Sequence, residues 1–131
     1  MEDTLDTSAR RVADCFFRAI EQNDLAAVAD LYSERLSVWH SSDNAVKGKA
    51  ESLAILQAVH QLGQLQYKVI ERVSDGERLA QRHDLTITKH SGEVFTLHVA
   101  IFMMTENGQI TTIHEYVDAA AVSAIMEPSA N

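Results

Sequence analysis

The sequence predicts an α+β fold, in which a curved, mixed but mostly antiparallel sheet wraps around helices from the N-terminal half. Two patterns and the chain length support this prediction. Before Gly63 the apolar residues recur mainly at helical spacing, whereas after it they alternate with polar residues with a period of two. The 131 residues, of which 46% are hydrophobic, are enough to form one core without disulfides. Because no repeat or linker divides the chain, we expect a single domain over residues 1–131.

In the N-terminal half we expect three helices and one short strand. Apolar residues recur three or four positions apart in each helix, as they do along the buried face of an amphipathic helix. In the first helix this stripe contains Val12, Phe16 and Ile20. Either Ser8 or Thr7 can cap its N-terminus. The expected helices span residues 9–22, 25–32 and 49–62, and the expected strand spans residues 35–41.

Four strands are expected after Gly63, which fits as the C-terminal cap of the third helix. The polar segments SDGE, KHSGE and TENGQ each contain a glycine and separate runs rich in Val, Ile, Thr and Phe, which is typical of hairpin turns. A short helix is expected near residues 119–126, before the tail that contains Pro128. The expected strands lie near residues 65–73, 78–89, 93–105 and 109–117.

The composition excludes several kinds of partner. The 19 acidic and 11 basic residues give a formal net charge of −8, which disfavours nucleic acids and anionic membrane surfaces.

Cys15 is the only cysteine, so no disulfide can form within the chain, and a buried, inert thiol is expected. The N-terminal residues lack the features of a signal peptide, and no apolar run is long enough to span a membrane. We therefore expect a cytoplasmic protein.

The strand expected from Phe95 to Met103 is apolar on both of its faces. Such a strand needs a layer on each side, so one face should line the interior and the other should meet a second element or subunit. We therefore expect a homodimer that packs through the outer face of the sheet. The side chains that share the inner face are Phe95, Leu97, Val99, Ile101 and Met103.

Three charged residues are candidates for catalysis. Arg82 and Asp84 lie two positions apart on an expected strand, so their side chains point to the same face. On the last strand Glu115 shares its face with Ile113 and Val117. If the three charges meet inside the protein, burial raises a carboxyl pKa while the arginine lowers it, which supplies the acid and base of a catalytic pair. The alternative is a cross-strand ion-pair ladder at the surface, which contributes little.

Other kinds of chemistry lack a recognisable motif. The six histidines form no HxxxH or HExxH spacing, so we expect no metal site. The sequence contains neither a G-x-S-x-G motif nor a phosphate-binding glycine loop. We therefore expect a protein that works without a metal or a cofactor.

The segments FFRAIEQNDLAAVADLYSERLSVWH, VKGKAESLAIL and ENGQITTIHEYVD, in this order, resemble the SnoaL-like superfamily. This superfamily shares a cone-shaped α+β barrel with nuclear transport factor two, ketosteroid isomerase and scytalone dehydratase, and the resemblance covers nearly the whole chain. It implies a pocket inside the cone that takes a small hydrophobic molecule. It implies less about activity, because this fold carries enzymes and binding proteins alike.

Within the superfamily, the Arg-x-Asp pattern of residues 82–84 is similar to a strand of limonene-1,2-epoxide hydrolases. In that family one carboxylate activates a water molecule, the other protonates the epoxide oxygen, and the arginine lies between them. The similarity implies that Glu115 is the general base and Asp84 the general acid, with Arg82 between them.

The resemblance also implies a pocket wall. Where epoxide hydrolases hold their water with a tyrosine and an asparagine, this chain has Trp39 and Ser41. Tryptophan offers a donor and no acceptor, and serine is shorter than asparagine. Ketosteroid isomerases would have their base near His40, and SnoaL-type cyclases have an acid on the last strand, where Glu115 stands. The implied wall consists of Phe16, Tyr32, Trp39, Ser41, Leu97, Val99, Ile101 and Met103.

The sequence therefore predicts a cofactor-free enzyme that acts on a small hydrophobic molecule through Asp84, Arg82 and Glu115. Epoxide hydrolysis, isomerisation and polyketide cyclisation are the candidate reactions. The alternative is a dimeric protein that holds a hydrophobic ligand in the same cone without chemistry.

Overall fold

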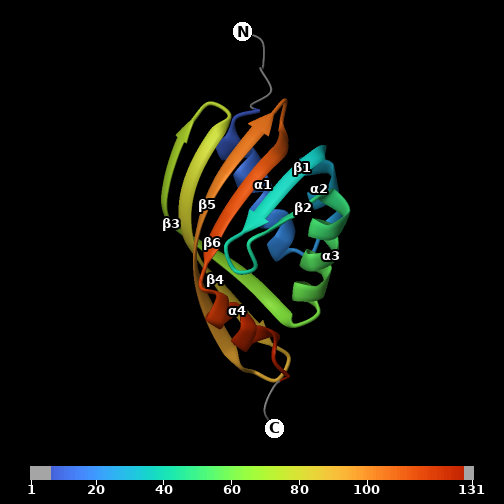
Figure 1. The fold of residues 1–131 in the computed structure, drawn as a ribbon, viewed down its shortest axis with the longest axis vertical. Coiled ribbons are helices and arrows are strands. Elements are labelled where there is room, and N and C mark those ends of the chain that lie inside the picture. The colour runs from blue at the N-terminus through green and yellow to red at the C-terminus, as the bar shows by residue number, and fades with distance from the viewer. Residues whose placement is uncertain (1–6, 129–131) are drawn as a thin grey trace.

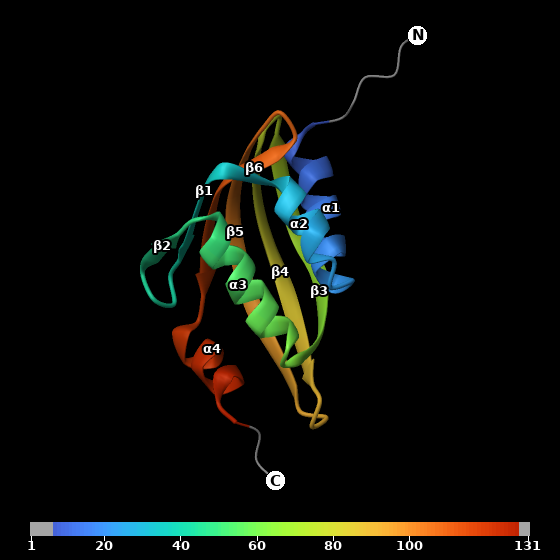
Figure 2. The same ribbon diagram turned by 90° about the vertical axis from the view of Figure 1, so that its right-hand side faces the viewer.

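A computed structural model describes residues 7–128 as a curved six-stranded sheet with helices on its concave side (Figures 1 and 2). The helices are α1 (Ala9–Glu21), α2 (Leu25–Leu31), α3 (Lys49–His60) and α4 (Ala119–Met126). The strands are β1 (Tyr32–His40), β2 (Ala45–Lys47), β3 (Gly63–Asp75), β4 (Arg78–Lys89), β5 (Val94–Glu106) and β6 (Gln109–Val117). Their order in the sheet is β2-β1-β6-β5-β4-β3, and only the β1–β6 pair is parallel.

The predicted α+β class, the mixed sheet and the order of the long elements are confirmed, and three details differ. The turn expected after β1 contains the short strand β2, which pairs with the end of β1. The sheet remains open in the described part of the chain, with β2 and β3 as its edges, so it is not a closed barrel. Gly63 begins β3 and does not cap α3, and a Cβ there would clash with the carbonyl oxygen of Thr88 on β4.

Helix α1 supplies the centre of the core. Ser8 caps the helix, because its hydroxyl accepts a 3.4 Å hydrogen bond from the backbone N–H of Arg11. The predicted stripe of Val12, Phe16 and Ile20 is buried against the concave face of the sheet. Ile20 is 1% exposed, so its whole side chain contributes to the hydrophobic stabilisation of this contact.

Burial alternates along β4, and this alternation decides which side chains reach the interior. Leu79 and Ile87 are buried on the concave side, and the residues in phase with them face the same way. These residues include the polar pair Gln81 and His83, which are 3% and 2% exposed. A strand that otherwise anchors the core therefore brings two polar groups into it.

Candidate functional site

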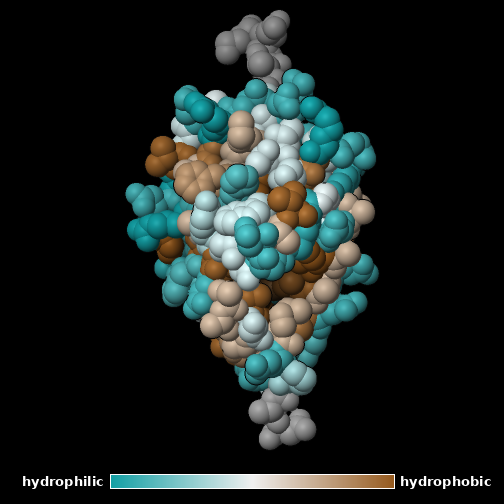
Figure 3. Space-filling model, viewed as in Figure 1, coloured by the Kyte–Doolittle hydropathy of each residue, from teal (hydrophilic) through white to brown (hydrophobic). Residues whose placement is uncertain are grey.

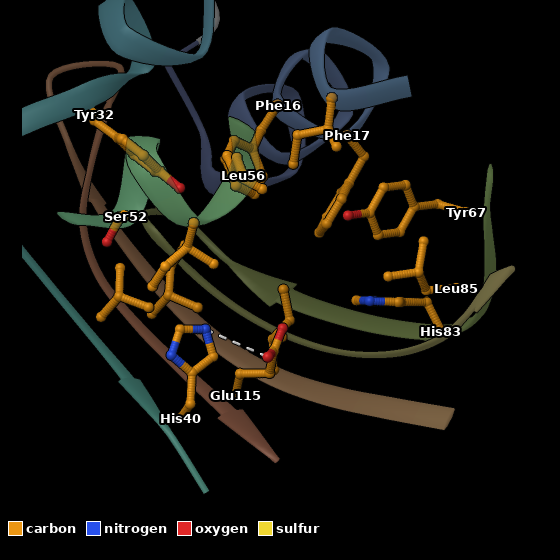
Figure 4. A pocket seen from close by; sticks show the side chains of 15 residues that line it. Phe16, Phe17, Tyr32, His40, Ser52, Leu56, Tyr67, His83, Leu85 and Glu115 are labelled. Atoms are coloured by element: carbon orange, nitrogen blue, oxygen red, sulfur yellow. Dashed lines mark ion pairs between the residues drawn. The ribbon is translucent and has the colours of Figure 1, made fainter. Parts of the chain in front are cut away.

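Two hollows that share part of their walls open between the concave face of the sheet and the helices, and Figure 4 shows the inner one. The inner hollow, of about 80 Å³, lies beneath α1 and the start of α3 and has a largely aromatic and aliphatic wall. The outer hollow, of about 450 Å³, runs under α3 to α4. A volume of this size fits a small organic molecule. The residues that line both hollows are His40, Ile55, Leu56, Tyr67, Leu85 and Glu115.

Glu115 brings a carboxyl group to the junction of the two hollows. It pairs with His40 across β1 and β6 and with Ile101 across β5 and β6, which fixes its side chain on the concave face. The side chain is 30% exposed, and because Glu115 lines both hollows this exposure opens into them. Burial raises the pKa of Glu115 from 4.5 to about 7. Both the acid and the carboxylate are therefore present at neutral pH.

His40 is the direct partner of this carboxyl group. Its Nε2 atom lies 3.4 Å from Oε2 of Glu115. Burial lowers the pKa of His40, and the positive charge of Lys47 lowers it further, while Asp43 acts in the opposite direction. A neutral imidazole next to a carboxyl that titrates near pH 7 can accept or return a proton.

The rest of the inner wall carries neutral hydrogen-bonding groups. Figure 4 shows Tyr67 and His83 on one side of the cavity and Tyr32 and Ser52 on the other. Burial raises the pKa of both tyrosine hydroxyls, so they remain protonated donors. The hydroxyl of Ser52 is buried and has no hydrogen-bond partner within residues 7–128. These groups can bind polar atoms of a ligand that is otherwise apolar.

Arg82 and Asp84 do not reach this cavity, so the expectation that they meet Glu115 inside the cone is wrong. Arg82 forms a 2.8 Å ion pair with Glu71, and Asp84 lies 2.7 Å from Nδ1 of His98, both on the outer face of the sheet. The physical reason is the alternation along β4, because burying Leu79, Leu85 and Ile87 turns the even-numbered side chains outward. The surface ion-pair interpretation thus holds for Arg82 and Asp84 and does not include Glu115.

Trp39 and Ser41 also lie outside the cavity wall, contrary to the prediction. The indole N–H of Trp39 donates a 2.9 Å hydrogen bond to Asn44, and its ring stacks edge-on against outer-face side chains. The hydroxyl of Ser41 accepts from the backbone N–H of Val117 at 2.9 Å and donates to its carbonyl at 3.0 Å. Both positions are out of phase with Val38 and His40, which point inward on the same strand.

The other predicted wall residues lie on the concave side. Phe16, Tyr32 and Ile101 line the inner hollow, and Leu97 and Val99 line the outer one. Met103 is fully buried in the core and lines neither hollow.

The sequence reasoning missed His40, Tyr67 and His83 as wall residues. A signal for two of them was present. His40 is in phase with the apolar residues Leu36 and Val38, and His83 is in phase with those of β4.

Within residues 7–128, no three His, Cys, Asp or Glu side chains gather in a way that could hold a metal ion. No helix in that range has both the length and the apolar character needed to cross a membrane. The expected absence of a metal and a cofactor, and the cytoplasmic location, stay predictions.

Comparison with known families agrees with this architecture. The family model described as the SnoaL-like domain matches residues 13–113. The chain belongs to the SnoaL-like family. No curated protein sequence matches the chain significantly.

Solved structures share the fold of this SnoaL-like protein at low sequence identity. An LEH-like epoxide hydrolase from M. tuberculosis has a TM-score of 0.76 and 16% identity, over 92% of this chain and 90% of that one. A protein assigned as a ketosteroid isomerase from Kribbella flavida has a TM-score of 0.71 and 20% identity, over 94% and 83% of the two chains. A protein assigned as a SnoaL-like polyketide cyclase from Shewanella denitrificans has a TM-score of 0.76 and 11% identity, over 90% and 96%. At these identities the likeness demonstrates a shared fold and leaves the reaction to the site itself.

Proposed function

We propose that this SnoaL-like protein is a cofactor-free enzyme that moves a proton on a small, mainly apolar molecule, with Glu115 as the proton-transfer group. One observation carries the proposal: the carboxyl group of Glu115 lies in an apolar cavity, 3.4 Å from the imidazole of His40. Burial brings the pKa of Glu115 to about 7, and a general base works best when its pKa is near the working pH.

The reaction that fits these groups is proton transfer at a carbon next to a carbonyl group. Glu115 would take the α-proton, and the electron pair of the broken C–H bond would move to the carbonyl oxygen as an enolate forms. Neutral donors on the cavity wall, such as the hydroxyl of Tyr67, would stabilise the charge on that oxygen. The proton would then return to the same or another carbon, which gives exchange or isomerisation.

Epoxide hydrolysis fits less well than the resemblance implies. That reaction needs an acid at the epoxide oxygen, and the implied acid, Asp84, lies on the outer face with Arg82. Among the candidate reactions, this arrangement favours isomerase or cyclase chemistry over epoxide opening.

The test is hydrogen–deuterium exchange at the α-carbon of a simple apolar ketone. We expect wild-type protein in D2O to speed the loss of the methyl signal of 2-acetylnaphthalene, followed by proton NMR. Glu115→Gln should slow the catalysed exchange by a factor of about 100 or more, which is the range for a general base. Glu106→Gln is the matched control, because Glu106 is 56% exposed and pairs with Arg35 away from the cavity. Equal exchange in wild type and Glu115→Gln would contradict the proposal.

A second candidate function is ligand binding without chemistry. The observation that favours it is the outer hollow, whose 450 Å³ is lined mostly by aliphatic side chains. Saturable binding of 2-acetylnaphthalene with no exchange above background would support this function over catalysis.

We also propose that the protein forms a homodimer through the outer face of its sheet. A row of side chains crosses all six strands on this face, and in Figure 3 brown apolar side chains are scattered over the side of the molecule where β1, β5 and β6 lie in front. Phe102 is 54% exposed near the centre of the row, and a contiguous exposed apolar patch of this kind often marks an interface. The paired residues of the row are Val46, Trp39, His114, Phe102, Ala80 and Val73.

Light scattering after size-exclusion chromatography tests the dimer. We expect wild type to have twice the mass of the 14.5 kDa chain, and Phe102→Arg to have the mass of a single chain. Val94→Arg, on the same strand and 61% exposed but outside the row, should remain dimeric. A wild-type protein that elutes as a monomer at micromolar concentration would overturn the proposal.

A further inference from the structure

A chain of polar side chains runs from the surface to the cavity wall and ends at His83. The carboxylate of Asp14 on α1 accepts a 2.6 Å hydrogen bond from the guanidinium of Arg72 on β3. The Nε–H of Arg72 donates a 2.7 Å hydrogen bond to Oε1 of Gln81 on β4. The amide Nε2 of Gln81 lies 2.9 Å from Nδ1 of His83. Three consecutive side-chain contacts thus connect the half-exposed carboxylate of Asp14 to the buried imidazole of His83.

The direction of each hydrogen bond follows from the chemistry of the groups. An arginine side chain can only donate, so the atom of Gln81 that faces Arg72 must be the amide oxygen. The NH2 group of Gln81 then faces His83, and a donor there requires Nδ1 to be an acceptor. The proton of a neutral His83 must therefore sit on Nε2.

The surroundings keep His83 neutral and hold its ring in place. The rings of Phe17 and Tyr67 pack edge-on against the imidazole, with centroids 5.1 and 5.3 Å away. Burial lowers the pKa of His83 to about 4; the negative charge of Asp84 opposes this effect, and the positive charge of Arg72 adds to it. A second proton on Nδ1 would also point at the NH2 donor of Gln81. The ring therefore has one protonation state and one orientation at neutral pH.

We infer that Asp14, Arg72 and Gln81 hold His83 as the neutral Nε2–H tautomer, which makes it a fixed hydrogen-bond donor to an oxygen atom of the molecule in the inner cavity. Within residues 7–128, no group accepts a hydrogen bond from Nε2 of His83. His83 is 2% exposed and lines the inner hollow, so an occupant of that hollow is the partner available to it. Arg72 and Gln81 are positioning residues, because they act on a ligand only through His83.

The donor restricts the class of ligand. A neutral oxygen acceptor such as a ketone satisfies it, whereas an ammonium group or a pure hydrocarbon leaves it unpaired in an apolar site. A carboxylate ligand is disfavoured, because it would be buried near the carboxyl group of Glu115. The inference rests on the proposed function in taking the inner hollow as the ligand site, and it adds the polarity of the group that binds there.

The first test reads the tautomer in the free protein by long-range proton–nitrogen NMR of 15N-labelled histidines at pH 8. We expect His83 to be protonated on Nε2 only. In Gln81→Glu the new carboxylate still pairs with Arg72 but can only accept a hydrogen bond at Nδ1, so the tautomer should switch to Nδ1–H. Arg72→Leu leaves the Gln81 amide free to turn and should give a mixture of tautomers. The matched control, Gln66→Glu on the exposed side of β3, should leave the wild-type spectrum of His83 unchanged.

Either of two outcomes would overturn this part of the inference. One is a wild-type His83 that carries its proton on Nδ1 or populates both tautomers. The other is a folded Gln81→Glu or Arg72→Leu protein in which Nε2–H persists alone.

The second test compares two ligands of the same shape at pH 8: 2-acetylnaphthalene and 2-isopropenylnaphthalene, in which a CH2 group replaces the carbonyl oxygen. The two ligands differ in how readily they leave water, so each affinity is first corrected for its transfer from water to hydrocarbon. After this correction we expect wild type to bind the ketone about tenfold more tightly than the alkene, because one hydrogen bond to a buried donor supplies such a factor. This excess should disappear in Gln81→Glu and persist in Gln66→Glu. No excess in wild type, or an equal excess in Gln81→Glu, would overturn the assigned ligand class.

These readouts separate the inference from the proposed function. The tautomer and the ketone preference need no turnover, so both can hold in a protein that exchanges no α-protons. Conversely, exchange that depends on Glu115 but not on the His83 tautomer would sustain the proposed function and reject the role of His83.

Discussion

Replacing Glu115 by glutamine should make the protein more stable at high pH, although it removes the proposed catalytic group. Glutamine and a protonated glutamate are close in shape, and neither is charged. The variant therefore resembles the wild-type protein at low pH, where Glu115 holds its proton. Above neutral pH the two proteins differ, because the wild type then carries a buried negative charge.

The magnitude follows from the pKa. Raising the pKa of Glu115 from 4.5 to about 7 corresponds to a penalty of about 3 kcal/mol for ionising the folded protein. Between these pH values the unfolded chain has lost the proton and the folded chain keeps it. The wild-type free energy of unfolding therefore falls as pH rises from about 4.5 to about 7, and the penalty is complete above pH 7. Glu115→Gln has no such term.

Other groups titrate in the same range with the opposite sign. The pKa of His83 is lowered from 6.5 to about 4, so the unfolded chain binds more protons there and stability rises with pH between these values. His40, whose pKa is also lowered, acts in the same direction. The wild-type curve alone is therefore not diagnostic. The difference between variant and wild type cancels the His83 contribution and leaves the contribution of Glu115 together with its contact to His40.

Urea unfolding of both proteins from pH 5 to pH 8 measures this difference. We expect Glu115→Gln to be more stable by about 1 kcal/mol at pH 5 and by about 3 kcal/mol at pH 8. A difference that stays constant across this range would mean that Glu115 ionises in the folded protein as it does in water.

Three further substitutions test the outer face of the sheet, the packing of α1 and the attachment of α4. Asp84→Asn should leave α-proton exchange on 2-acetylnaphthalene unchanged in the NMR assay, because Asp84 faces away from the cavity. Loss of exchange would mean that Asp84 takes part in catalysis, as the resemblance to epoxide hydrolases implies. Ile20→Ala should lower the urea-unfolding free energy by roughly 2–5 kcal/mol, as expected for a fully buried side chain, and a change below about 1 kcal/mol would contradict the packing of α1. Lys89→Met removes the 2.8 Å hydrogen bond from Nζ to the carbonyl of Glu127, so amide hydrogen exchange in α4 should accelerate while exchange in β4 does not.

The sequence predicts the long elements well because one physical signal dominates them. Apolar residues that must be buried recur with a helical period in α1 and with a period of two in the strands, and no competing signal opposes them. Strand β2 has only three residues, too few for a period to appear. Whether the two edge strands, β2 and β3, meet to close a barrel depends on contacts between residues far apart in the sequence. Periodicity carries no information about such contacts.

The site is harder to predict because the charged residues Arg82 and Asp84, which suggest a catalytic pair, lie on the outer face of β4. Arg82 and Asp84 match a family pattern, but the apolar residues of the same strand occupy the odd-numbered positions, and they determine which face is buried. The same rule places Gln81 and His83 on the buried face of β4, where His83 reaches the cavity wall. Glu115 faces the cavity, as the aliphatic neighbours on its face of β6 predict, and its catalytic role stays a prediction. The link from Arg72 to Asp14, 58 positions apart, has no local signal in the sequence.

A crystal structure of the protein with 2-acetylnaphthalene would show whether the cavity binds a ketone between His83 and Glu115. We predict that the ketone lies in the concave cavity, with its oxygen within hydrogen-bond distance of Nε2 of His83 and its methyl group facing the carboxyl of Glu115. A ketone that binds with its oxygen away from His83, or that sits on the outer face of the sheet beside Asp84, would rule out this mode of binding.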